Sequence, residues 1–177
     1  MTMKRTAIAV LLILSTLIAA AQDEKSKRPS PPGSAQFTFA DGKKITIDYS
    51  RPSVKGRKIY GGLVPYGQVW RTGANEATTF VTEKDIDVGG TRVPQGSYTL
   101  YTMPTQAGWK LIINKQTGQW GTEYDQSQDL ARIDAKKEPL SKPVEQFTIS
   151  FDPASGDATT LRLDWENTRV AIPIKGQ

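Results

Sequence analysis

Short stretches of alternating apolar and polar residues limit most strongly what this chain can fold into. The alternation recurs from Gln36 to about Ile174, and glycine, proline or aspartate separates one stretch from the next. Because successive side chains of a strand point to opposite faces of a sheet, alternation predicts strands with one buried face. About eight to ten short strands of this kind predict an all-β domain, either an antiparallel β-sandwich or a flattened barrel.

Two turns predict hairpins. Asp41-Gly42 lies between the alternating residues 37–39 and 45–49. Asp-Gly tolerates the positive φ angles of a type I′ turn, which matches the twist of paired strands. Gly89-Gly90 follows a short apolar stretch and predicts a second hairpin.

The later stretches predict which side chains face the core. These are Tyr98, Leu100, Trp109, Leu111, Ile113, Phe147, Ile149, Phe151, Leu161, Leu163, Trp165, Val170, Ile172 and Ile174. Arg162, Asp164 and Glu166 alternate with them and are expected to face solvent. Pro173 predicts an edge strand, because proline cannot donate to a ladder of hydrogen bonds. Residues 127–137 fit a helix or a strand equally well.

The amino terminus has the pattern of a secretory signal peptide over residues 1–21. Lys4 and Arg5 precede an apolar run at 7–18, and alanines follow at 19–21. The run is shorter than the ~20 residues that a helix needs to cross a bilayer, so an uncleaved anchor is the competing interpretation. We therefore expect an exported protein, periplasmic or extracellular, that is soluble and has no membrane span after cleavage.

Residues 22–35 contain three prolines and no large apolar side chain. Such a stretch buries too little surface to offset the entropy lost on ordering, so it predicts a flexible linker. Residues 36–174 then form one β-sandwich domain, a length typical of a single core.

The chain has no Cys and no His. Disulfides, thiol nucleophiles, Ser-His-Asp triads and His-ligated metals are therefore excluded. Paired carboxylates, a Ser-Lys pair, a Tyr or oxygen-ligated Ca²⁺ remain. Asp85 and Asp87 are too few to hold Ca²⁺ and predict a solvated strand face. We expect no cofactor and no metal.

The charge gives no indication of a nucleic-acid partner. The 23 Lys and Arg include Lys4 and Arg5 of the leader, so 21 basic residues face 18 acidic ones after cleavage, a net charge of +3. No basic stripe interleaved with aromatic residues occurs, as a nucleic-acid groove would require.

The segment from Arg51 to Thr78 departs from the alternating pattern. A long aperiodic segment inside a compact domain is more often functional than a short turn is. Its arginines match carboxylates or phosphates, its aromatic rings offer flat faces for stacking, and an asparagine serves hydroxyl groups. The ligand-binding residues predicted here are Arg57, Tyr66, Trp70, Arg71, Asn75 and Glu76.

A purely structural interpretation of the same segment stays open. In this alternative Arg71 pairs with Glu76, and Trp70 closes the end of the core. Trp120 lies in a glycine-flanked loop and predicts an exposed aromatic side chain beside the segment.

Three motifs carry a resemblance to a known family. They are GGLVPYGQVWRTGANEAT at 61–78, VPQGSYTLYTMP at 93–104 and GWKLIIN at 108–114. With them the chain resembles the uncharacterised bacterial family called domain of unknown function 2911, over roughly residues 30 to 174. The resemblance implies an exported, mostly β domain with no established activity, and it carries over no catalytic residue.

The sequence therefore favours a non-enzymatic domain of the cell envelope that binds a small anionic or sugar-like ligand or a protein partner. The alternative is a His-free hydrolase that acts on glycans or peptides through a carboxylate such as Glu76. Such a role requires a Glu76 without a cationic partner. A third hypothesis is a structural adaptor that docks an envelope protein through exposed loops or a sheet edge.

Overall fold

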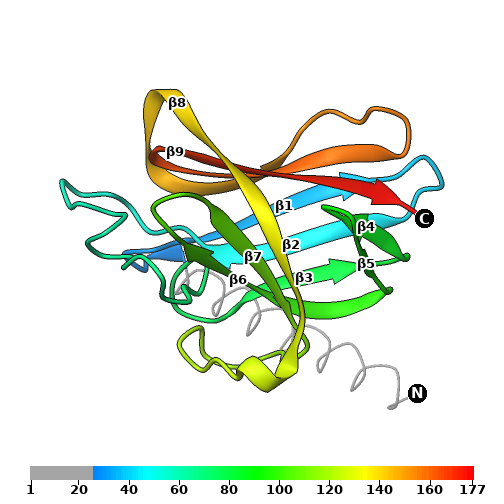
Figure 1. The fold of residues 1–177 in the computed structure, drawn as a ribbon, viewed down its shortest axis with the longest axis horizontal. Helices are drawn as coiled ribbons and strands as arrows, with labels where there is room; N and C mark the ends of the chain where they lie inside the picture. The colour runs from blue at the N-terminus through cyan, green and yellow to red at the C-terminus, as the bar shows by residue number, and fades with distance from the viewer. Residues whose placement is uncertain (1–25) are drawn as a thin grey trace, which may run out of the picture.

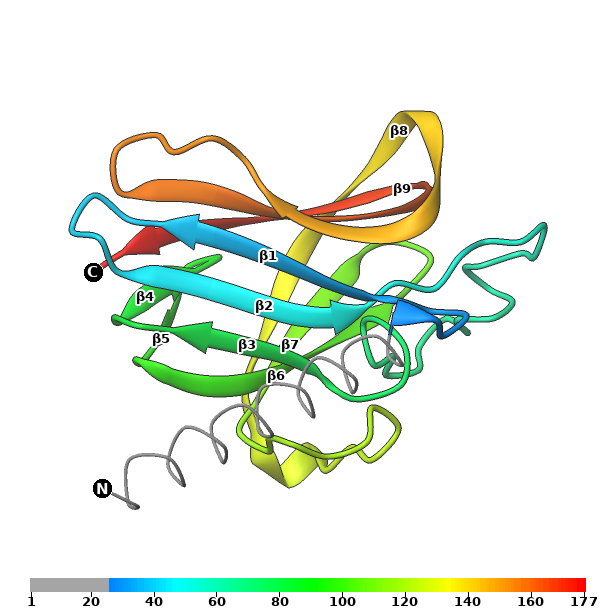
Figure 2. The same cartoon turned by 180° about the vertical axis from the view of Figure 1, so that it is seen from behind.

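The computed structural model describes residues 26–177, which form an all-β fold (Figures 1 and 2). The predicted signal peptide, residues 1–21, lies outside the described residues. The strands in chain order are β1 (Pro32–Thr38), β2 (Lys44–Ser50), β3 (Thr78–Thr82), β4 (Ile86–Val88), β5 (Thr91–Val93), β6 (Gly96–Pro104), β7 (Trp109–Asn114), β8 (Asp129–Phe151) and β9 (Ala158–Gly176). A 3-10 turn, η1 (Gln126–Gln128), precedes β8.

The nine strands hydrogen-bond in the order β1-β2-β3-β6-β7-β8-β9-β4-β5, and every pair is antiparallel. The sheet folds over into two layers, as Figure 2 shows, which confirms the predicted sandwich. β1 and β5 stay at the two ends of the order, so the sheet is not closed and the flattened barrel was wrong.

One strand belongs to both layers. The first part of β8 pairs with β7, from Asp129 to Ala135, and the rest pairs with β9 from Lys136 onward. Figure 1 shows β8 running from one layer to the other. Strands that switch sheets in this way form the corners of sandwiches whose layers cross. At 23 and 19 residues, β8 and β9 are longer than the short strands predicted.

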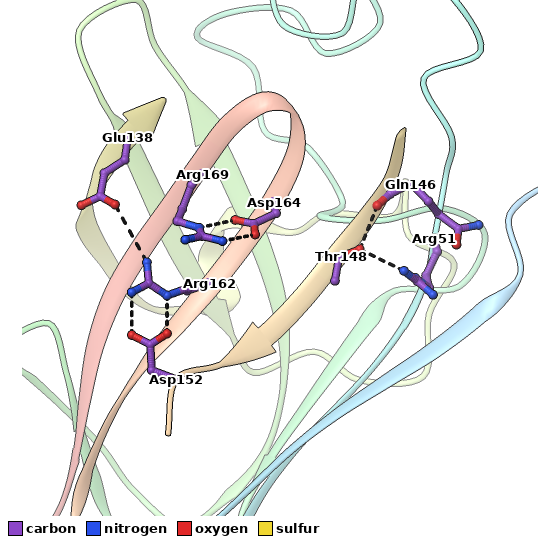
Figure 3. A network of polar contacts seen from close by, with 8 residues as sticks. All are labelled: Arg51, Glu138, Gln146, Thr148, Asp152, Arg162, Asp164 and Arg169. Atoms are coloured by element: carbon purple, nitrogen blue, oxygen red, sulfur yellow. Dashed lines mark hydrogen bonds and ion pairs between the residues drawn. The ribbon is translucent and has the colours of Figure 1, made fainter. Parts of the chain in front are cut away.

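The core lies between the layers and holds the residues that the alternation predicted. All of them are buried except Phe151, which is half-buried. At the open edge, the Tyr49 hydroxyl accepts from the Ile149 amide at 2.8 Å and donates to its carbonyl at 3.4 Å. Arg51 donates to the Phe147 carbonyl at 3.2 Å and to Thr148 at 2.9 Å (Figure 3). These bonds join β2 to β8 without pairing them as strands.

The structure corrects two predicted boundaries. β1 begins at Pro32, so the domain starts before Gln36 and the linker does not extend to residue 35. Residues 129–137 are strand, which decides between the two structures that fitted 127–137. Ala131, Ile133 and Ala135 pair with β7 and share the face of β8 toward the core, while Arg132 and Asp134 between them are exposed.

Two orientations were also predicted wrongly. Asp164 is 7% exposed, because Arg169 donates two hydrogen bonds to its carboxylate at 2.7 and 2.5 Å (Figure 3). The pairing with Arg169 satisfies the Asp164 carboxylate at a position that the alternation assigns to solvent. Pro173 does not lie on an edge strand, since β9 runs between β8 and β4. It lies beyond Ala171, the last residue of β9 that pairs with β8, so its missing N–H interrupts no bond there.

Candidate functional site

The segment between β2 and β3 leaves the first layer, crosses to the second and returns. Outward, the Val54 amide donates to the Glu145 carbonyl, and the Phe147 amide donates to the Pro52 carbonyl, both at 2.8 Å. On its return, Trp70 exchanges backbone hydrogen bonds of 2.7 and 2.9 Å with Thr102 of β6. The segment is therefore tied to both layers at one end of the sandwich.

A cleft of about 380 Å³ lies under this segment. Its size falls within the range of about 300–1,000 Å³ found for small-molecule sites. The walls are mostly apolar or aromatic, two arginines face the cleft, and none of its lining residues is acidic. The lining residues are Ser30, Pro52, Arg57, Leu63, Val64, Pro65, Gln68, Val69, Trp70, Arg71, Gly73, Ala74, Tyr101, Gly121, Thr122, Tyr124 and Trp165.

Stacked rings hold two of the aromatic walls in place. Trp70 stacks on the fully buried Trp165, with ring centroids 5.4 Å apart and planes at 16°, and meets the edge of Phe147 at 5.1 Å. Tyr101 and Tyr124 meet edge to face at 4.8 Å. Such aromatic pairs contribute beyond the area that they bury, so these walls are rigid surfaces.

Arg71 is the cleft cation without a partner. Its guanidinium makes no hydrogen bond or ion pair with any described residue, and neither does the indole N–H of Trp70 beside it. The stem of Arg71 packs on Gly121, where a Cβ would stand 2.8 Å from the Arg71 Cδ. Packing thus fixes the stem and leaves the five guanidinium donors available.

The backbone after Arg71 is strained. Thr72 has φ +51°, a left-handed conformation that β-branched residues rarely adopt. The Thr72 hydroxyl contacts Thr102 at 3.1 Å, and the Thr72 carbonyl accepts from the Thr78 hydroxyl at 2.9 Å. Strained residues cost about 1–3 kcal/mol each, persist only where their surroundings fix them, and cluster at functional sites. Sequence gave no signal for this strain.

The structure turns Asn75 and Glu76 toward the scaffold. The Asn75 amide donates to the Ser30 carbonyl and the Ser50 hydroxyl, both at 3.2 Å. Glu76 pairs with Arg28 at 2.9 Å, not with Arg71 as the structural alternative held. Neither residue lines the cleft. The predicted pairing of Arg71 with Glu76 was therefore wrong.

Arg57 and Tyr66 lie at the outer end of the segment. Arg57 lines the cleft while donating to the Val54 carbonyl at 3.0 Å and the Ser53 carbonyl at 2.5 Å, so part of its fork is engaged. The ring of Tyr66 covers Gly61 and does not line the cleft. Of the six predicted residues, the structure brings together Arg57, Trp70 and Arg71.

The opposite wall was not predicted. The Tyr124 hydroxyl donates to Asp129 and accepts from Arg132, both at 2.6 Å. Burial, with a contribution from Asp129, raises the pKa of Tyr124 to about 12, so the Tyr124 hydroxyl stays protonated well above neutral pH. Trp120 in the same loop is exposed, as predicted, and its backbone bridges to Glu76 beside the segment. In the sequence, the aromatic residues of this loop were the one indication of the wall.

The described part of the chain contains neither a metal-binding cluster nor a membrane-spanning helix. No group of three or more acidic side chains is placed to hold a metal ion. Asp85 instead pairs with Arg92 at 2.7 Å, and Asp87 accepts from the Gly90 amide. Within residues 26–177, no helix has the length and apolar character needed to cross a membrane.

Comparison with known proteins decides the family. A family model described as "Protein of unknown function (DUF2911)" matches residues 30–174. The chain belongs to this family. The DUF2911 match starts two residues before β1 and ends within β9, so it includes all nine strands except the last two residues of β9. Neither the curated proteins nor the solved structures yield a match to this DUF2911 domain.

Proposed function

We propose that this domain binds a small organic anion with a flat, apolar body in the cleft and catalyses no reaction on it. The observation that carries the proposal is the Arg71 guanidinium, which faces an aromatic-walled cleft without a partner. A buried or half-buried charged group is normally paired, so an available fork at a concave site favours an anionic guest.

The rest of the lining supports the same class of ligand. Arg57 adds a second positive charge, and no carboxylate among the lining residues opposes it. A planar guanidinium fits a carboxylate through two parallel hydrogen bonds. The Trp70 ring offers a face to a ring-shaped body, and its free N–H offers one more donor. We assign Arg71 and Trp70 the direct contacts, with Arg57 at the outer rim.

The residues predicted to act beside them take supporting roles in this proposal. Asn75 and Glu76 tie the strained segment to the residues before β1, which holds Arg71 in position. The arrangement disfavours the hydrolase alternative, because Glu76, the carboxylate named for it, lies outside the cleft next to a guanidinium.

We also propose that the domain works outside the cytoplasm. This rests on the sequence of residues 1–21, whose charged start, short apolar run and closing alanines fit a cleaved leader. The ligand would then be an anion of the periplasm or of the surroundings of the cell.

Isothermal titration calorimetry with 1-naphthoate, and with neutral 1-naphthalenemethanol as its matched analogue, tests the binding. We expect naphthoate to bind more tightly than the alcohol, and Arg71→Gln to weaken naphthoate roughly tenfold or more, the value of a charge-assisted hydrogen bond. The alcohol should bind Arg71→Gln and the parent equally.

Arg92→Gln is the matched control, because Arg92 is an exposed cation outside the cleft. It should leave both affinities unchanged. Equal affinity for the two compounds, or an Arg71→Gln variant that binds naphthoate as the parent does, would contradict the proposal.

A further inference from the structure

A loop from Lys55 to Gln68 projects beyond the sheets, as Figure 2 shows. We call it the 55–68 loop, and part of it lines the cleft. It is anchored by three buried side chains, Ile59, Tyr60 and Val64, and all its other residues are exposed. Backbone hydrogen bonds fold it on itself, including Leu63 to the Lys58 carbonyl at 3.0 Å and Val64 to the Ile59 carbonyl at 2.9 Å. The loop is therefore a preformed surface.

This loop exposes large apolar side chains. Leu63 is 48% exposed and Tyr66 is 37% exposed. Of the large hydrophobic residues in the described chain, only Trp120, at 45%, is exposed to a similar degree. The Tyr66 ring is held against Gly61, where a Cβ would come within 2.7 Å of the ring. The fold thus leaves both side chains exposed, Leu63 as part of the cleft lining and Tyr66 outside the cleft.

The excess positive charge of the domain is concentrated in the stretch of chain that includes the 55–68 loop. Residues 51–75 contain five Lys and Arg and no Asp or Glu. In the other described residues, 26–50 and 76–177, fifteen basic residues face sixteen acidic ones. Lys55, Arg57 and Lys58 are exposed on the 55–68 loop, and none of them forms an ion pair with a described residue.

From this combination we infer that the 55–68 loop docks on the surface of a membrane that contains anionic lipids. The cations are attracted by the headgroups, Tyr66 suits the interface, and Leu63 reaches the acyl boundary. An acidic polysaccharide would satisfy the cations but offers Leu63 no apolar phase. The inference does not depend on a ligand in the cleft.

Vesicle co-sedimentation tests it with two compositions, phosphatidylcholine alone and a 3:1 mixture of phosphatidylcholine and phosphatidylglycerol. We expect binding to the mixture, little binding to phosphatidylcholine alone, and loss of binding in high salt. Neutralising two cations in Lys55→Gln/Lys58→Gln should lower the partition coefficient roughly 30-fold, at about fivefold per charge. Leu63→Ser should lower it about tenfold.

Two variants serve as controls. Trp120→Ser removes an exposed ring outside the 55–68 loop, and Arg92→Gln removes an exposed cation outside residues 51–75; both should bind the mixed vesicles as the parent does. Equal sedimentation with both compositions, or no sedimentation with either, overturns the inference. Binding that depends on the lysines but is unchanged in Leu63→Ser also overturns it, because headgroup charge alone then accounts for the binding and Leu63 does not reach the acyl boundary.

Discussion

Replacing Asn75 separates two contributions to the stability of the strained segment: the hydrogen bonds of the Asn75 side chain and the left-handed conformation of its backbone. Asn75 has φ +59° and donates two hydrogen bonds, to the Ser30 carbonyl and the Ser50 hydroxyl. Each neutral hydrogen bond contributes about 1 kcal/mol to stability. A left-handed conformation costs an ordinary residue about 1–2 kcal/mol, which Asn partly avoids and Gly avoids entirely.

The two substitutions at this position should therefore differ. Asn75→Ala loses both bonds and keeps an unfavourable backbone, so the free energy of unfolding should fall by about 3 kcal/mol. Asn75→Gly loses the bonds alone and should cost about 2 kcal/mol. At about 3 °C per kcal/mol for a domain of this size, the Tm should fall by about 9 °C and about 6 °C.

Urea unfolding followed by tryptophan fluorescence measures both free energies, and calorimetry measures the two Tm values. Arg71→Ala is the matched control, because its guanidinium has no partner among the described residues, and it should cost less than about 1 kcal/mol. Equal losses for Asn75→Ala and Asn75→Gly would refute the backbone argument. If Arg71→Ala lowers the free energy of unfolding as much as Asn75→Ala does, the assignment of Asn75 to the scaffold and of Arg71 to ligand binding is contradicted.

Two further changes test the packing and the charges. Gly121→Ala places a Cβ 2.8 Å from the Asn75 carbonyl oxygen, so it should cost about 1–3 kcal/mol in urea unfolding, and an unchanged midpoint would contradict this close approach. Hydrogen bonds from Arg162 lower the pKa of Asp152 from its ordinary 3.8 (Figure 3), so this stabilisation is present above that pH and is lost as the pH falls through the lower folded value. Asp152→Asn should accordingly lose less stability than the parent between pH 7 and pH 2; equal losses would contradict it.

The alternation predicted the strands well, because period two follows from local geometry alone. It did not predict that β8 would continue through Pro139 and Pro143, which cannot donate to a ladder of hydrogen bonds. Their pairing is irregular there, with register shifts between Pro139 and Val144. A strand that bends between two layers is specified by its partners, which lie far away in the sequence.

The pattern of residues predicted which segment forms the candidate site but not which way its side chains point. The departure from alternation located the segment that forms the cleft, and Arg71 and Trp70 line it. The partners of Asn75 and Glu76 come from Ser30 and Arg28, more than forty residues earlier, in a stretch whose composition predicted a linker. Composition reports how much surface a stretch can bury, and it does not report a few specific hydrogen bonds.

The continuity of β8 has a consequence for the cleft. Tyr101 belongs to the first layer and Trp165 to the second, so the cleft is bounded by both. The layers share one unbroken strand, which changes partners between Ala135 and Lys136. Any change in the angle between the layers is therefore a change in the curvature of that strand. The distance between the two aromatic walls of the cleft therefore depends on how strongly β8 bends.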